Sequence, residues 1–267
     1  MTAGAGLSSR AVCGLALTSA IFLTTLPARA QDAQCAAPLQ ARALEHAPTH
    51  FRERIAKGLP LKIVAIGSSS TSGAGASSPA MTYPARLEAE LKARLPGRPI
   101  TVLNKGIGGE EAPQMVARFD ADVFDEAPDL VLWQVGSNSV LRDHPAPGET
   151  IRQGVERLKA SGTEVILINP QYAPKIIAKG AEVDRAVDTI TATARDLEVG
   201  VFDRFVAMRY WREAEHLPFE QFVNADGLHM NDWGYGCIAR LLATAIVDDA
   251  QPPATTAKVS AGPTAVK

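Results

Sequence analysis

The feature that most constrains the fold is an alternation of short apolar segments with longer amphipathic segments. The clearest apolar segment covers residues 61–66 and stops at a turn rich in glycine and serine, residues 67–73. An uninterrupted apolar run of this length is typical of a strand buried on both faces of a parallel sheet. Glycine and serine end such a strand because they favour turns. Further strands are predicted at 100–103, 129–135, 165–168 and 199–202.

Helices are predicted between these strands. Residues 82–95 carry Leu87, Leu91 and Leu95 at spacings of four, which is the apolar stripe of a helix that packs on a sheet. Similar patterns predict helices at 35–57 with a break at Pro48, and at 112–124, 150–160, 181–197 and 233–247. Strand and helix alternate about five times. The sequence therefore predicts an α/β domain, a three-layer α/β/α sandwich around a parallel sheet of about five strands.

The two ends of the chain differ from this pattern. Arg10 is the only charge before the mostly apolar residues 11–26, and Ala28-Arg29-Ala30 has the form of a cleavage site. We expect residues 1–30 to be a signal peptide and the product to be periplasmic or secreted. The alternative, a membrane anchor, is less favoured because a span needs about 20 residues. Residues 31–250 would form the domain, and the composition of 251–267 predicts a disordered tail.

Charge and cysteine content narrow the function classes. The net charge is −2, and loss of the two arginines of the leader would make the chain more acidic. This balance gives no indication of a nucleic-acid partner or of stable membrane insertion. Cys35 and Cys237 would remain after cleavage, and in an oxidising compartment they predict one disulfide, although two separate thiols stay an alternative. No cysteine spacing indicates a metal, and we expect no metal and no cofactor.

Three strands end in polar or glycine-rich turns, at residues 67–73, 106–109 and 136–138. In a parallel sheet these turns emerge at one edge and can form one site. Nucleotide binding is poorly supported, because Gly73 is followed by Ala74 where a phosphate-binding loop needs lysine, and neither glycine cluster completes a dinucleotide fingerprint. Thr71 likewise occupies the second glycine position of a G-x-S-x-G nucleophile elbow.

A serine nucleophile would need a base, and His229 is the best of the five histidines. It follows Asp226 by three residues, and Gly227 allows the tight turn that brings the carboxylate to the imidazole. An aspartate on one ring nitrogen leaves the other free to accept a proton from serine. Alone, this spacing also fits a capping arrangement or a structural pair.

Four blocks together resemble the SGNH hydrolase superfamily, the GDSL-type esterases and lipases. The first block of that family, Gly-Asp-Ser-x-Thr, is similar to Gly67-Ser68-Ser69-Ser70-Thr71. The other blocks are similar to Asn104 through Gly109, to Gly136-Ser137-Asn138, and to Asp226 with His229. Order, spacing and placement at strand ends agree from residue 61 to about 248. Two positions depart from the family pattern. Ser68 replaces the usual aspartate of the first block, and Ser139 follows Asn138 where the family often has aspartate.

The resemblance implies a flavodoxin-like SGNH fold and a role for each residue. Ser69 would be the nucleophile, His229 the base and Asp226 its orienting carboxylate. The backbone N–H groups of Ser69 and Gly109, with the side chain of Asn138, would form the oxyanion hole. The departures at Ser68 and Ser139 bear on the local geometry of the site and on substrate preference more than on the hydrolytic activity itself.

The prediction is therefore an exported serine esterase that acts on acyl or acetyl esters of a small molecule, a glycan or a lipid. Two alternatives remain, an acyltransferase that passes the acyl group to a glycan, and a carbohydrate- or lipid-binding domain without catalysis. Acyl-chain length, the alcohol part of the substrate and the oligomeric state stay open. Four aromatic residues are candidates for the pocket or for the core: Trp133, Tyr172, Trp211 and Trp233. Core packing is favoured for Trp133, because it lies within a predicted strand.

Overall fold

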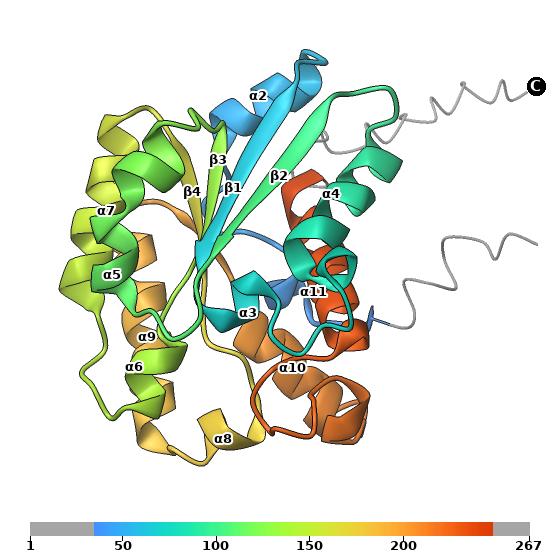
Figure 1. Ribbon diagram of the computed structural model, residues 1–267, viewed down its shortest axis with the longest axis vertical. Helices are drawn as coiled ribbons and strands as arrows, with labels where there is room; N and C mark the ends of the chain where they lie inside the picture. Colours follow the sequence, from blue (N-terminus) through green and yellow to red (C-terminus); the bar gives the residue numbers. More distant parts are fainter. Residues whose placement is uncertain (1–34, 248–267) are drawn as a thin grey trace, which may run out of the picture.

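One parallel sheet forms the centre of the molecule (Figure 1). The computed structural model describes residues 35–247, so the predicted leader and the predicted tail lie outside the described residues. The five strands lie in the order β2-β1-β3-β4-β5, and every neighbouring pair is parallel. This is the flavodoxin-like order, and it confirms the predicted fold class. The strands are β1 (Leu61–Gly67), β2 (Ile100–Gly106), β3 (Leu130–Gln134), β4 (Glu164–Ile168) and β5 (Gly200–Phe202).

Helices cover both faces of the sheet, as Figure 1 shows. Alternate residues of β1 enter different cores: Ile63 packs with one set of helices, and Val64 packs with the other. The first set is α2 (Thr49–Ala56), α4 (Tyr83–Arg94), α10 (Arg204–Glu213) and α11 (Asp232–Val247). The second set is α5 (Ala112–Ala117), α7 (Gly148–Ala160) and α9 (Ala181–Asp196). The result is the expected three-layer sandwich.

Shorter elements lie between these strands and helices along the chain. They are α3 (Ser69–Ser72), α6 (Ser137–Leu141), α8 (Pro174–Ile177) and the short turns η2 (Leu39–Ala41), η3 (Pro79–Met81), η4 (Asp120–Phe124) and η5 (Phe219–Gln221). Two of them begin directly at a predicted block: α3 starts at Ser69, and α6 follows Gly136.

Two predicted helices are corrected, and one helix of the second half of the chain was missed. The predicted helix 35–57 is wrong before Pro48, where the short turn η2 forms instead, whereas the helix α2 does follow Pro48. The Glu164 carboxylate of β4 accepts the N–H groups of His50 and Phe51 and so holds the start of α2. The predicted helix 112–124 is interrupted, since α5 ends at Ala117 and the π-helical turn η4 follows. Helix α10 was not predicted.

The order of the strands places the topological switch point of the sheet between β1 and β3. From β1 the chain crosses to β2 on one side, whereas from β3 it crosses to β4 on the other side. The loops that follow these two strands therefore diverge, and ligands of open α/β sheets bind at such a switch point. The loops after β1 and β3 carry Ser69 and Asn138.

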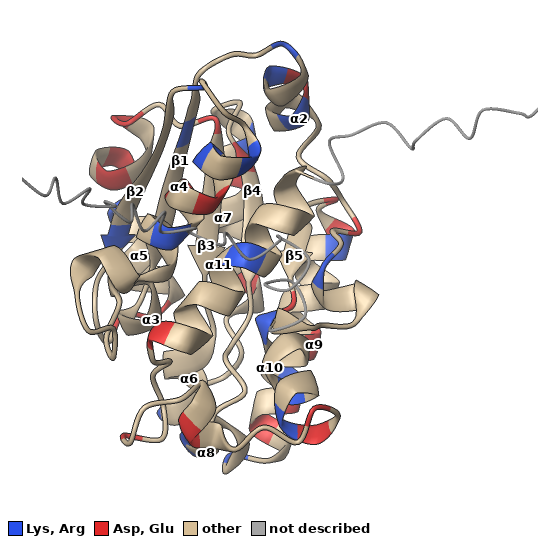
Figure 2. Ribbon diagram, turned by 90° about the vertical axis from the view of Figure 1, so that its right-hand side faces the viewer, with Lys and Arg blue, Asp and Glu red and all other residues tan. Residues whose placement is uncertain are grey.

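A disulfide joins Cys35 to Cys237 of α11, with a sequence separation of 202 and a Cα–Cα distance of 5.3 Å. Basic and acidic residues are interspersed on the face seen in Figure 2. Many of them pair; Glu90, for example, contacts both Arg94 and Arg240 across α4 and α11. Of the helices within residues 35–247, none has the length and apolar character that a membrane span requires.

Candidate active site

The three serines after β1 differ in their partners. The backbone N–H and the Oγ of Ser68 both donate to Gln134 Oε1, each at 2.9 Å, and Ser70 Oγ donates to the same oxygen at 3.1 Å. Both of these serines are buried, whereas Ser69 is partly exposed. Ser69 Oγ instead lies 2.8 Å from His229 Nε2. Gln134 thus holds the two flanking hydroxyls inward and leaves Ser69 facing the histidine.

The loop before α11 builds the partner of Ser69. Asp226 Oδ1 accepts the backbone N–H groups of Leu228 at 2.9 Å and of His229 at 3.0 Å, which is the local turn that aspartate favours. The other carboxylate oxygen, Oδ2, lies 2.5 Å from His229 Nδ1. One aspartate therefore shapes the turn and orients the imidazole, so that Nε2 points to Ser69.

A close contact joins the serine loop to the histidine loop. Asn224 Nδ2 donates to the carbonyl oxygen of Gly75 at 2.7 Å. A Cβ atom on Gly75 would lie 2.5 Å from the carbonyl oxygen of Met230 and 3.1 Å from His229 Cβ. Only glycine allows the two loops to approach this closely, and this approach sets the distance between Ser69 and His229.

Hydrogen bonds stabilise the ionised form of the Asp226 carboxyl group. Partial burial raises the pKa of this carboxyl, but the bonds from the His229 ring and from two backbone N–H groups outweigh burial, so its pKa lies below the ordinary value. The carboxylate is therefore ionised at neutral pH. An ionised aspartate can stabilise an imidazolium that forms on its neighbour.

Donors for an oxyanion border the same site. Asn138 Nδ2 donates one hydrogen to the carbonyl oxygen of Glu110 at 2.8 Å, which fixes the amide and leaves its second hydrogen for another acceptor. Gly109 adopts φ +83°, a conformation that glycine accepts without strain. Across the described residues, the backbone N–H groups of Ser69 and Gly109 donate to no other protein group. These groups are free to bind a ligand oxygen.

The structure accounts for both departures from the family pattern. Ser68 donates to Gln134, so a neutral amide from β3 is the partner at this position. Ser139 Oγ donates to Glu111 Oε2 at 3.0 Å, and Arg142 and His144 contact the same carboxylate. A carboxylate is thus present beside Ser139, although it comes from the start of α5.

Sequence reasoning missed the partly buried Glu111 and three buried polar residues, Gln134, Gln171 and Arg204. Gln134 could have been found from the sequence, because it is a polar residue at the end of an otherwise apolar strand. For Glu111 the signal was the pair Glu111 and Gln114, which form a capping box at the start of α5. No local pattern marks Gln171 or Arg204, because their partners are distant in sequence.

The four aromatic candidates lie in different places. Trp133 and Trp211 are buried in the two cores, which corresponds to the core alternative. Trp233 packs against Trp211 with the rings edge to face, and Tyr172 donates its hydroxyl to Glu213. The sequence pattern favoured the core for Trp133, which lies within a strand, and did not separate the other three.

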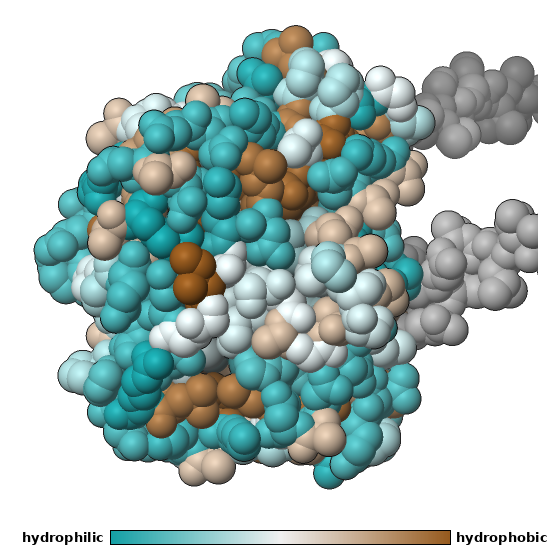
Figure 3. Space-filling view, viewed as in Figure 1, coloured by the Kyte–Doolittle hydropathy of each residue, from teal (hydrophilic) through white to brown (hydrophobic). Residues whose placement is uncertain are grey.

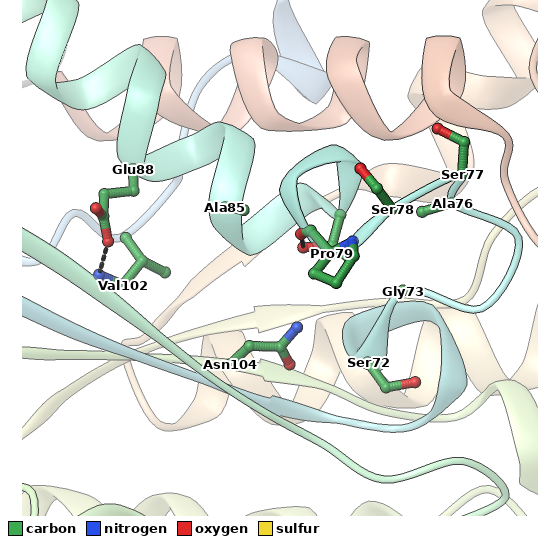
Figure 4. Close-up of a pocket in the computed structure, with 11 residues that line it drawn as sticks. Ser72, Gly73, Ala76, Ser77, Ser78, Pro79, Ala85, Glu88, Val102 and Asn104 are labelled. Atoms are coloured by element: carbon green, nitrogen blue, oxygen red, sulfur yellow. Dashed lines mark hydrogen bonds between the residues drawn. The ribbon is translucent and has the colours of Figure 1, made fainter.

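A cavity of about 580 Å³ lies beside the serine turn, along the outer edge of β2 (Figure 4). Ser72, Gly73, Ser78 and Asn104 are among its lining residues, and the N–H of Val102 at this edge is satisfied by Glu88. Ser69 and His229 do not line it. Over residues 35–247, no group of three His, Cys, Asp or Glu side chains is arranged as metal ligands.

The fold and the site geometry define a class: a parallel α/β sandwich with a hydrogen-bonded serine, histidine and aspartate at its switch point has the groups that ester hydrolysis needs. The model of the Non-GDSL lipase-like family matches residues 34–252, and the chain belongs to this family. As a member of a lipase-like family it is an ester-hydrolysing enzyme.

Solved structures with the same fold are esterases and an α/β hydrolase. A two-domain esterase (CEX) active on acetylated mannans is 22% identical with a TM-score of 0.65; the match covers 79% of this chain and 56% of that one. The chain thus spans little more than half of that relative. LAE5, an α/β hydrolase from the metagenome of Lake Arreo, is 28% identical with a TM-score of 0.60, and 71% and 97% of the two chains are covered.

Axe2, an acetylxylan esterase from Geobacillus stearothermophilus, is 24% identical in one mutant structure, with a TM-score of 0.60 and coverage of 71% and 95%. No curated protein matches the sequence significantly.

Proposed function

We propose that the chain is a serine esterase that removes an acyl group through an acyl-enzyme on Ser69. The observation that carries the proposal is the continuous row from Ser69 Oγ through the His229 ring to the Asp226 carboxylate. This row assigns a nucleophile, a base and an orienting group to three side chains that already contact one another.

The first half of the reaction transfers the acyl group to the enzyme. Ser69 Oγ attacks the ester carbonyl carbon while His229 Nε2 takes the hydroxyl proton. The carbonyl π electrons move to oxygen and form the tetrahedral intermediate. When the intermediate collapses, the bond to the alkoxy oxygen breaks, and His229 gives its proton to the departing alcohol. Water then repeats both steps on the acyl-enzyme, which releases the carboxylic acid and restores Ser69.

Stabilisation of the oxyanion is assigned to three donors: the N–H groups of Ser69 and Gly109 and the side chain of Asn138. Support comes from the two unengaged N–H groups and from the fixed amide of Asn138. Loss of one such donor typically lowers the rate about 10²- to 10³-fold. The four sequence blocks and this donor set together favour the finer assignment to an SGNH-type hydrolase over other lipase-like enzymes.

An acetylated glycan is the substrate class that we propose. CEX is active on acetylated mannans and Axe2 is an acetylxylan esterase, and two of the Axe2 structures are catalytic mutants in which a serine or a histidine is replaced by alanine. The same residue types meet here as Ser69 and His229. Export of the enzyme, predicted from residues 1–30, would place it where such glycans occur.

The decisive test is the Ser69→Ala variant, assayed on p-nitrophenyl acetate. We expect hydrolysis to fall to the background rate while the melting temperature stays within a few degrees, because a partly exposed hydroxyl contributes little to packing. Ser78→Ala is the matched control: Ser78 is exposed in the neighbouring cavity and should leave the rate unchanged. Full activity of Ser69→Ala would contradict the proposal.

The acyl group is tested by comparing acetyl, butyryl and octanoyl esters of the same alcohol and by acetate release from acetylated xylan and mannan. Acyl-chain length is the variable to test, because apolar surface is present: Figure 3 shows an apolar band in its lower part. Leu228, which precedes His229, belongs to an apolar cluster with Leu141 and Ile177. A steep fall beyond acetyl, together with acetate release, supports the glycan substrate. A rise with chain length would contradict it and leave the esterase assignment intact.

A further inference from the structure

A buried cation lies beneath the proposed site. Arg204, the first residue of α10, is completely buried. Its guanidinium donates three hydrogen bonds: to Ser70 Oγ at 3.0 Å, to Gln171 Oε1 at 3.0 Å and to the carbonyl oxygen of Asn169 at 3.1 Å. All three acceptors are neutral.

No carboxylate pairs with Arg204 in the part of the chain that the structure describes. The adjacent Asp203 is engaged elsewhere, since its carboxylate accepts Asn169 Nδ2 at 2.8 Å and the N–H of Val206 at 3.0 Å. Burial of a charge without a counter-ion costs stability, and a neutral side chain would fill the same space without that cost. The arrangement therefore points to a use for the charge.

One arm of the guanidinium reaches the serine turn. Ser70 follows Ser69, and Ser70 Oγ accepts from Arg204 while it donates to Gln134 Oε1. The same Gln134 oxygen accepts both groups of Ser68. The residues on either side of Ser69 are thus held by one connected network in which Arg204 is the only charged donor.

The second arm reaches the other two catalytic segments. Gln171 Oε1, the acceptor of Arg204, also accepts Ser137 Oγ at 2.8 Å, and Ser137 directly precedes Asn138. Gln171 Nε2 donates to the carbonyl oxygen of Leu228 at 3.4 Å, and Leu228 directly precedes His229. A single side chain is therefore connected to the neighbours of Ser69, Asn138 and His229.

We propose that Arg204 is a positioning residue of the esterase: its guanidinium sets the relative positions of the serine, asparagine and histidine segments and places a positive charge beneath the developing oxyanion. This inference rests on the proposed function. Burial lowers the pKa of Arg204 to about 10, so the guanidinium remains charged at neutral pH. A fixed charge in a site shielded from water acts more strongly on a transition state than one in solvent.

The test compares Arg204→Met, which removes the charge at similar length, with Arg204→Lys, which keeps it. For Arg204→Met on p-nitrophenyl acetate we expect a kcat about 10- to 100-fold lower with KM within about threefold, because the loss falls on the transition state. Arg204→Lys should recover part of that loss. Arg94→Met is the matched control, since Arg94 also bridges two segments, through Thr244 and the Arg240 carbonyl, but on the outer helices. Its kcat should not change.

A folded Arg204→Met variant with kcat within threefold of the parent would overturn the inference, as would equal kcat values for the Met and Lys variants. If Arg204→Met does not fold, Ser70→Ala and Ser137→Ala carry the test, because each removes one arm and leaves the charge. We expect each to lower kcat about 3- to 10-fold at unchanged KM; full kcat in both refutes the proposal. Activity in Ser69→Ala would refute the esterase mechanism instead, so the two failures are distinguishable.

Discussion

The close approach of Gly75 to the histidine loop leads to a quantitative prediction for Gly75→Ala. The new Cβ would lie 2.5 Å from the Met230 carbonyl oxygen, whereas ordinary contacts begin near 3.4 Å. The histidine loop must therefore shift by about 1 Å, which lengthens the 2.8 Å contact between Ser69 Oγ and His229 Nε2 beyond a useful hydrogen bond. A misplacement of about 1 Å costs roughly 10²-fold in rate.

The assay is kcat and KM on p-nitrophenyl acetate together with thermal unfolding. Gly162→Ala is the matched control: Gly162 has φ +79°, close to the φ +91° of Gly75, but a Cβ there meets nothing within 4 Å. Both variants incur the backbone strain of about 1–2 kcal/mol, and only Gly75→Ala should lose kcat. If Gly75→Ala keeps kcat within threefold of Gly162→Ala, the contact does not set the geometry of the site and the reasoning is refuted.

Two further predictions concern the histidine loop and the disulfide. Asp226→Asn should lower kcat about 10³- to 10⁴-fold, because an amide does not hold the imidazole in the required tautomer; kcat within tenfold of the parent would contradict the assigned role. The pKa of Asp226 is lowered in the folded state, so its ionised form stabilises the fold at neutral pH. This contribution is lost as the pH falls through the lowered pKa. The unfolding free energies of the parent and of Asp226→Asn, measured in urea, should therefore converge in acid. The double variant Cys35→Ser with Cys237→Ser should lose up to about 5 kcal/mol of unfolding free energy, since the bond closes a loop of 202 residues; urea unfolding with an unchanged midpoint would exclude this contribution.

The main strands were predictable from local sequence because burial on both faces of a parallel sheet requires continuous apolar runs. Strands β1, β3, β4 and β5 begin or end within one or two residues of the predicted ranges, and β2 continues three residues further, to Gly106. Prediction failed where distant residues decide. The start of α2 depends on Glu164, and α10 was missed although Asp203 caps it.

The candidate site shows the same division. Sequence alone determined the four blocks, their order and their placement at strand ends, because turn chemistry and apolar periodicity are local properties. It could not distinguish Ser68, Ser69 and Ser70 without the family resemblance, since the three are chemically identical. Tertiary structure separates them, because Gln134 from β3 accepts two hydroxyls and leaves one facing His229. Only folding brings that amide and the charge of Arg204 to the serine turn. The hydrogen bonds involved join residues 64 and 134 positions apart, and such bonds depend on the packing of the whole sheet.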